Sequence, residues 1–523
     1  MTTLAVGRRH RTVPWSILGP MLVLALWEAA IQASQQTYVI AAPSTILVYI
    51  AENAGLLSRA LGATLVNAAA GFILGNLAAI LLAAVAIAVP RAEAVIRGLA
   101  LLVFCLPVVA TGPILRVFFG PGDWPQIILA ALAVYYTTLI PLLVGLRAVP
   151  SGWLDLVSSF GRGRWASLVY IRSAASVPYL VAGLQIAAPA AFLGAMVGEF
   201  TGAERGMGVL TIRSMRAMDI EMTWSLAVIA TAVSVMSFVA IGRIGRRFMS
   251  EPPPTLLATP VLGGNSALYT FLVPVVVGIV AVVLWWSALK LLHLNPFFAK
   301  GPVEVFDALL LASDAARTRH TLGTALSETA VYLVPGYLAG LFVGAALAVA
   351  LVQLPSIAGT AIPLAVALRS VPIITTAPLV VLLLGRGATG TITLVAIMVF
   401  FPTFLACLHG LRQAPGQIVD VMRSYAASSQ DLLVRVRIPA MLPAFFAAAR
   451  INVPASVLAV TVVEWLATGN GIGSLMALSA SLSDYDMLWS SVVLVAALSV
   501  VGYGAVGLVE RRVLAVYAPE QLR

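Results

Sequence analysis

The second half of the chain repeats the first half at a constant offset of 265 residues, so that Gly71 recurs as Gly336. The register holds without a gap from about Ala63 to Arg247. Alanine, leucine and valine coincide by chance in so apolar a chain, so the register rests on rarer residues. These coincide as the pairs Pro113 and Pro378, Gly120 and Gly385, Arg147 and Arg412, Asp155 and Asp420, Glu199 and Glu464, and Asp219 and Asp484. A repeat of this length predicts two copies of one architecture.

The composition predicts that both copies lie in a lipid bilayer. Of the 523 residues, 61% are hydrophobic and only 10% are charged, whereas soluble proteins carry roughly a quarter charged residues. This excludes a soluble enzyme and a disordered chain, and an outer-membrane barrel would alternate apolar and polar residues. An all-α polytopic membrane protein is therefore predicted. The net charge of +10 then marks the cytoplasmic ends of membrane helices rather than a nucleic-acid partner.

Each copy offers six apolar segments of roughly the 20 residues that a membrane-spanning helix needs. In the first copy they lie near residues 15–33, 63–88, 95–118, 125–146, 177–198 and 224–242. In the second copy they lie near residues 268–289, 328–352, 357–384, 389–411, 442–463 and 489–508. We predict twelve transmembrane helices in two parallel six-helix repeats, because an even number of spans gives both copies one orientation. The predicted units are a first repeat at 1–247, a linker at 248–267 and a second repeat at 268–523.

The arginines predict the orientation. Arg8, Arg9 and Arg11 precede the first apolar segment, and no convincing cleavage site follows it, so we interpret it as an uncleaved helix. With the N-terminus in the cytoplasm, most arginines of the first copy face the cytoplasm, as expected for membrane proteins. We therefore expect a multi-pass protein of a prokaryotic inner membrane with both termini in the cytoplasm.

One longer loop in each copy joins the fourth and fifth segments on the predicted cytoplasmic side. Each loop is predicted to form a short amphipathic helix, a small-residue turn and a second short helix that ends at a proline. This element suits docking of two copies of a cytosolic partner, with small or polar residues on the docking helix. The candidate docking residues are Asp155, Ser158, Gly161, Arg162 and Arg164 in the first loop, and Asp420, Arg423, Ala426 and Ser429 in the second. Because Ala426 takes the place of Gly161, its turn is either right-handed or slightly strained.

These loops resemble the coupling loop, or EAA motif, of ABC importer permeases. Glu199 followed by Gly206-Met-Gly208, and the run Arg369-Ser-Val-Pro372, are similar to signatures of the nitrate, sulfonate and taurine branch of that family. The resemblance covers nearly the whole chain, twice. The motif's glutamate is replaced by Asp155 in the first copy and by Asp420 in the second.

The resemblance implies the transmembrane pore subunit of a type I ABC importer, with two permeases fused in one chain. It implies two ABC ATPase subunits as partners, which carry ATP and Mg²⁺, and an extracytoplasmic substrate-binding protein. We expect no enzymatic activity and no bound cofactor in this chain, because neither Lys290 nor Lys300 belongs to a Walker A loop. The branch suggests a small, often anionic solute, but relatives that carry vitamin precursors keep the substrate open.

Candidate pathway or gate residues lie on the third and fifth segments. Glu199 and Glu464 are each either a gate or docking contact, or a structural carboxylate bonded to nearby backbone. Arg450, which stands where the first copy has Gln185, and Arg369 have no acid at the paired position. Each arginine either lines a path for an anion or has a structural place, which for Arg369 is the membrane interface.

Two other classes of protein fit the sequence less well than the importer. A secondary transporter of the major facilitator type also has two parallel six-helix halves, but it places a basic Gly/Asp/Arg motif between its second and third helices. This chain has only Val89-Pro90-Arg91-Ala92 there. An integral membrane enzyme is disfavoured because no catalytic constellation is visible. Cys407 and His409 supply too few ligands for a metal site.

Overall fold

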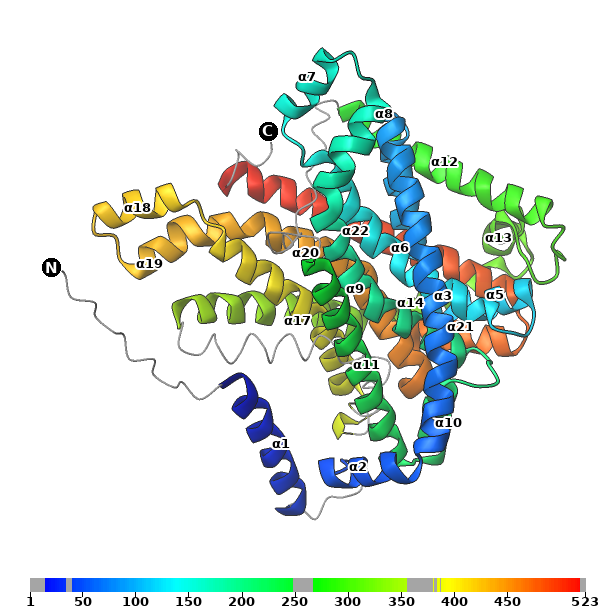
Figure 1. The fold of residues 1–523 in the computed structure, drawn as a ribbon. Helices are drawn as coiled ribbons and strands as arrows, with labels where there is room; N and C mark the ends of the chain where they lie inside the picture. The colour runs from blue at the N-terminus through cyan, green and yellow to red at the C-terminus, as the bar shows by residue number, and fades with distance from the viewer. Residues whose placement is uncertain are drawn as a thin grey trace.

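The computed structural model describes residues 15–33, 40–247, 267–354, 380, 383–385 and 387–517. Within these residues the chain is helical and has no strand. The predicted all-α fold class is therefore confirmed. Figure 1 shows the long helices crossing the molecule, with the short helices at their ends.

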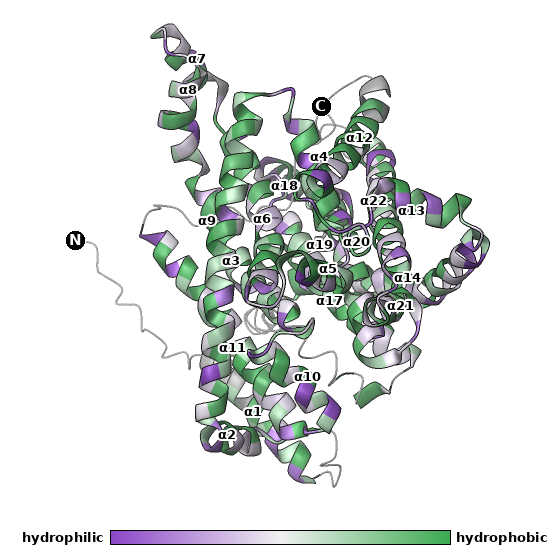
Figure 2. Ribbon diagram, turned by 90° about the vertical axis from the view of Figure 1, so that its right-hand side faces the viewer, coloured by the Kyte–Doolittle hydropathy of each residue, from purple (hydrophilic) through white to green (hydrophobic). Residues whose placement is uncertain are grey.

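Apart from the counterparts of α4 and α5, which lie outside the described residues, the helices of the two repeats follow one another in the same order. The first repeat contains α1 (Trp15–Ala33), α2 (Pro43–Glu52), α3 (Ala54–Ala88), α4 (Glu93–Phe104), α5 (Val108–Phe119), α6 (Trp124–Arg147), α7 (Ser151–Ser159), α8 (Arg164–Ala166), α9 (Ser173–Phe200), α10 (Met207–Ala217) and α11 (Ile220–Arg246). The second contains α12 (Ala267–Leu291), α13 (Pro302–Phe306), α14 (Ala315–Gln353), α17 (Ala388–Arg412), α18 (Gly416–Ser424), α19 (Ser429–Leu432), α20 (Ile438–Val463), α21 (Gly471–Ser481) and α22 (Tyr485–Tyr517). Short π-helical turns precede α9 and α20 and follow α13 and α20. Figure 2 shows that the long helices are largely hydrophobic, while hydrophilic residues gather near α7, α10 and α13.

The number of membrane spans differs from the prediction. Nine described helices are long and apolar enough to cross a membrane, or ten if the bent pair of α4 and α5 is one span. The segment expected near 95–118 is not one continuous helix, because α4 and α5 meet at 95°. Pro107, the residue before α5, has no backbone N–H and disfavours a helical residue before it. The segment expected near 357–384 and the linker lie largely outside the described residues, so a count of twelve is not confirmed.

The sequence repeat has a structural counterpart at the start of α11 and α22. The Asp219 carboxylate accepts a hydrogen bond from the Met222 N–H at 2.9 Å. The equivalent Asp484 accepts one from the Met487 N–H at 3.1 Å. Both aspartates therefore cap the helix that follows them, because the first N–H groups of a helix have no partner within it.

Glycines of the repeat allow helices to approach closely within each half. A Cβ at Gly75 of α3 would lie 2.6 Å from the Ala131 carbonyl oxygen of α6. At the equivalent Gly340 of α14, a Cβ would lie 2.6 Å from the Ala396 carbonyl oxygen of α17. Small residues at helix contacts provide tight packing in lipid, where the hydrophobic effect does not drive helices together.

Two helices of the second repeat, α12 and α21, pack against helices of the first repeat. α12 belongs to the second repeat but packs on α4 of the first, where a Cβ at Gly98 would collide with Val277. Ala110 and Ile114 of α5 share an apolar cluster with Ile472 of α21. The halves therefore form one body through apolar contacts of the first repeat with α12 and α21.

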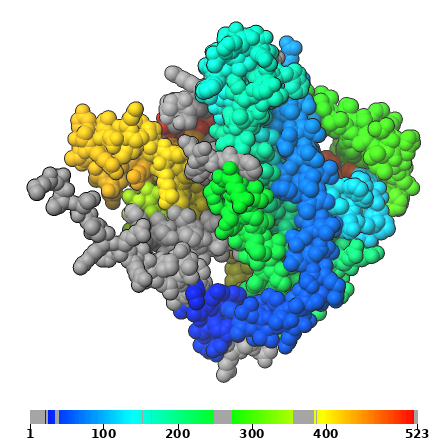
Figure 3. Space-filling view, viewed as in Figure 1, coloured from blue at the N-terminus to red at the C-terminus, as the bar shows by residue number. Residues whose placement is uncertain are grey.

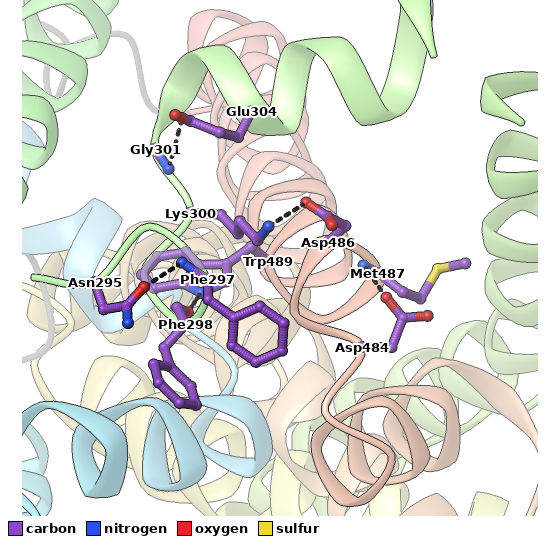
Figure 4. Close-up of polar contacts among 10 residues, drawn as sticks. All are labelled: Asn295, Phe297, Phe298, Lys300, Gly301, Glu304, Asp484, Asp486, Met487 and Trp489. Atoms are coloured by element: carbon purple, nitrogen blue, oxygen red, sulfur yellow. Dashed lines mark hydrogen bonds and ion pairs between the residues drawn. The ribbon is translucent and has the colours of Figure 1, made fainter. Parts of the chain in front are cut away.

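The segment between α12 and α13 is fastened to the start of α22 (Figure 4). Lys300 Nζ lies 3.2 Å from Asp486 Oδ1, and the Trp489 indole N–H donates to the Phe298 carbonyl at 3.0 Å. The Trp489 ring also stacks on Trp285 of α12, with 5.5 Å between ring centroids. The first and last long helices of the second repeat are thus tied together at one end.

Candidate functional site

The turn between α9 and α10 holds a buried carboxylate over the start of α10. Glu199 is only 1% exposed, and its Oε2 accepts a hydrogen bond from the Gly208 N–H at 2.6 Å. Thr64 of α3 accepts one from the Met207 N–H at 2.8 Å. A helix N-terminus carries N–H groups without partners and favours negative charge, and these two side chains meet both needs. A Cβ at Gly206 would collide with the Glu199 carboxylate, so only glycine fits at this position.

The second repeat builds the same turn between α20 and α21. Glu464 is fully buried, and its Oε2 accepts a hydrogen bond from the Gly473 N–H at 2.8 Å. Thr329 Oγ1 accepts one from the Ile472 N–H at 2.9 Å. These contacts support the structural alternative for both glutamates, and a gating role for them stays a prediction.

Equivalent residues of the two repeats contact each other beside these turns. The rings of Phe200 and Trp465, which occupy the same repeat position, meet edge to face with 5.9 Å between centroids. Val197 and Val462, also equivalent, are buried in the same apolar cluster. Two equivalent positions can touch each other only near the axis that relates the copies. The cluster of Val197, Phe200, Val462 and Trp465, called the axis cluster below, therefore marks the pseudo-two-fold axis.

The predicted docking loops project from the molecule. In Figure 1, α7 and α8 form the projection at the top, and α18 and α19 form the one on the left. The predicted docking residues that are exposed are Asp155, Ser158, Gly161, Arg162, Asp420, Arg423, Ala426 and Ser429. Arg164 lies in α8, and its side chain is outside what the structure describes. Both loops are therefore accessible to a partner.

Each docking helix also exposes large apolar side chains, which the sequence analysis missed. In α7 and at its end, Trp153, Leu156 and Phe160 are 59%, 50% and 76% exposed. The equivalent residues of the second loop, Ile418, Val421 and Tyr425, are 50%, 55% and 83% exposed. The spacing i, i+3, i+7 places each trio on one helix face and is the signal that was available. The exposed surface of each docking helix is therefore partly apolar, and which of its residues contact a partner stays a prediction.

The turns within the two loops have the same geometry. Gly161 and Ala426 both adopt a left-handed backbone, with φ of 68° and 53°. The Arg162 N–H donates to the Val157 carbonyl at 3.2 Å, and the equivalent Ala427 N–H donates to the Met422 carbonyl at 3.0 Å. This is the Schellman ending of a helix, in which glycine is preferred. Of the two alternatives for Ala426, the strained left-handed turn is the one observed.

Known proteins match both halves of the chain. A family model described as the binding-protein-dependent transport system inner membrane component matches residues 75–250 and again residues 336–515. The chain belongs to this family. A probable ABC transporter permease protein of Haemophilus influenzae is 28% identical over 238 residues, which covers 45% of this chain and 97% of that protein. The formylaminopyrimidine transport permease protein ThiX of Halalkalibacterium halodurans is 24% identical over 225 residues, covering 43% and 90%. The taurine transport system permease protein TauC of Escherichia coli is 25% identical over 228 residues, covering 42% and 81%.

The protein is thus a multi-pass permease of an ABC importer in the inner membrane. It is about twice as long as these relatives, since less than half of it covers nearly all of one of them. The two family matches favour this function over the major facilitator alternative.

Arg450 of this permease has an acidic partner that the sequence analysis did not predict. Its Nε lies 3.1 Å from Glu510 Oε2 of α22, and the two side chains are 14% and 5% exposed. The first repeat has Gln185 and Gly245 at the equivalent positions. The two charges are therefore specific to the second repeat, and each neutralises the other. This favours an ion pair that holds α20 against α22 over a site for an anionic solute. Arg369 lies outside the described residues.

We expect Arg450→Gln to lower the free energy of unfolding by about 3 kcal/mol, because it leaves a buried carboxylate without a counter-charge. The double variant Arg450→Gln with Glu510→Gln removes both charges and should lose much less. Thermal unfolding of the purified permease measures both, and Arg512→Gln, at a nearby exposed residue, is the control. An equal loss in the single and double variants would show that the pair does not stabilise the fold.

We expect Ala426→Gly to stabilise its loop and Gly161→Ala to destabilise its loop, by about 1 kcal/mol each. A Cβ at Gly161 meets no atom within 4 Å, so the cost comes from the backbone alone. Amide hydrogen exchange at Arg162 and Ala427 reports the opening of each turn. Gly163→Ala is the matched control, because a Cβ at Gly163 also meets open space and its φ is not positive. Unchanged exchange in both variants would contradict the shared turn geometry.

Proposed function

We propose that this single chain forms the complete translocation pathway of its importer, where other permeases of the family would need two chains. The contact between Phe200 and Trp465 carries this proposal. A permease with one repeat has only one member of each equivalent pair, so a second chain must complete its axis. Here both members belong to one chain.

In this proposal, the axis cluster closes the pathway at the end of α9 and α20. Val197 and Val462 are 3% and 2% exposed, and the rings of Phe200 and Trp465 meet beside them. Apolar constrictions block a pore by excluding water from it. Opening then requires α9 and α20 to separate at this end.

The two exposed loops would each dock on one of two ATPase subunits, which bind ATP and hydrolyse it. The apolar faces of α7 and α18 become buried in grooves of these partners. α9 connects the first loop to the axis cluster and has 28 residues, which corresponds to about 42 Å of helix. A movement of the loop on the ATPase therefore tilts α9 and shifts Phe200 at its far end.

The solute is proposed to be a small organic or inorganic compound that a substrate-binding protein delivers from outside. The names of the taurine and formylaminopyrimidine permeases support small solutes, and relatives named for sulfonate and nitrate transport support an anion. Because Arg450 is paired with Glu510, Arg450 is not an argument for an anionic solute. We also propose that both termini are cytoplasmic, on the strength of the arginine distribution.

The mass of the purified importer tests the proposal. We expect one copy of this chain with two ATPase subunits, measured by native mass spectrometry of the complex assembled in the cell. A complex with two copies of the chain per ATPase pair would show that one chain does not form the pathway alone.

A further inference from the structure

A cavity of about 580 Å³ opens on the first repeat, between α3, α10 and the turn that precedes α10. Arg59, Arg205 and Arg213 line it together with two acids, Asp123 and Glu204, so its lining carries one net positive charge. Among the described residues, no ion pair joins any of these arginines to either acid. The guanidinium groups are therefore available to an anionic ligand.

Two further groups in the cavity are suited to an oxyanion. Asn67 of α3 lines it and is only 4% exposed, and its side chain makes no hydrogen bond with any described residue. Gly206 lines it too, at the N-terminus of α10, which is 11 residues long. No polar atom of the Asn67 side chain is sealed away from the cavity, and its amide has two donors to offer a ligand. At the start of α10, Thr64 and Glu199 already accept from Met207 and Gly208, which leaves the Gly206 N–H as the remaining donor. The Asn67 amide and the Gly206 N–H are therefore the donors that an oxyanion in the cavity would meet.

The second repeat has a carboxylate at the position equivalent to this cavity. There Glu328 Oε2 accepts a hydrogen bond from the Gly471 N–H at 2.9 Å, and Gly471 is equivalent to Gly206. The first repeat has Ala63 in place of Glu328, and so lacks this carboxylate. The three arginines are replaced in the second repeat by Thr324, Asn470 and Leu478. The second repeat thus supplies its own anionic oxygen, whereas the first repeat has the cationic groups and no side chain to fill the position.

The surface beside the cavity indicates the kind of anion. Val66 lines the cavity and is 68% exposed. It begins a stripe of exposed apolar residues along the same face of α3, with Ile73, Leu77 and Leu81 at 59%, 54% and 65% exposure. Figure 3 shows α3, in blue, on the surface of the molecule. The cavity is lined by the first repeat alone and shares no residue with the axis cluster.

We propose that this cavity binds the phosphate group of an anionic phospholipid, with an acyl chain along the exposed stripe of α3. Arg59 and Arg213 hold the phosphate oxygens, the Asn67 amide and the start of α10 donate to them, and the stripe covers the chain. The proposal does not depend on the number of chains in the importer, because lipid binding is measured on this permease alone.

Native mass spectrometry of the full-length permease, titrated with phosphatidylglycerol or phosphatidylcholine, tests the site. We expect a preference for phosphatidylglycerol that falls about fivefold for each arginine removed in Arg59→Gln and Arg213→Gln. Ala63→Glu supplies the carboxylate of the second repeat and should remove the preference without removing an arginine. Arg216→Gln, on the same helix but outside the cavity lining, is the matched control.

Four results would overturn the proposal. The first is equal binding of the two lipids by the unmodified chain. The second is an equal loss of binding in Arg216→Gln. The third is complete displacement of the lipid by millimolar inorganic phosphate, which would indicate a site for a free anion. The fourth is unchanged lipid binding in the cavity variants together with weaker capture of the substrate-binding protein, which would indicate a docking site for acidic side chains. Melting temperatures of all variants confirm that each is folded when its lipid binding is compared.

Discussion

The structure depends on satisfying backbone N–H groups that the turns after α9 and α20 bring into an apolar interior. Such groups cannot bond to water inside a membrane, so the protein must supply acceptors. Glu199 and Thr64 do so in the first repeat, and Glu464 and Thr329 do so in the second. Because each threonine lies on a different helix from its glutamate, the same bonds fix three helices relative to one another. The axis cluster lies beside these turns and takes its position from them.

The two repeats share this framework but differ in the charges placed on it. The second repeat carries the pair of Arg450 and Glu510 between α20 and α22, where the first has uncharged residues. It also satisfies the N–H of Gly471 with its own carboxylate. The first repeat instead has a basic cavity at the equivalent place. Fusion in one chain fixes each half in its own position, so the halves are able to diverge while the contact surface at the axis stays complementary.

Much of this architecture could be predicted from the sequence, because each feature of one repeat is found again at the equivalent position of the other. The family, most helix positions and the two projecting loops were predicted from residues that recur at one offset. The break at Pro107 was not predicted, because a proline in an apolar segment is compatible with a kinked helix as well as a broken one. The partner of Arg450 could not be predicted because Glu510 lies on another helix, and their contact depends on how α20 packs against α22. An amphipathic helix was predicted in each loop, but which of its faces stays exposed depends on how the loop packs on the rest of the protein, and the sequence does not show that packing.

The central claim is that equivalent positions of one chain meet on its own pseudo-two-fold axis. It is tested most directly by cross-linking cysteines placed at Phe200 and Trp465, after replacement of the native Cys105 and Cys407 and introduction of a protease site within residues 248–266. The account predicts that a short bifunctional thiol reagent joins the two halves within one chain. The product then keeps the mass of one chain, and its halves stay together after proteolysis. Halves that separate after proteolysis, or a product with the mass of two chains, would contradict the account.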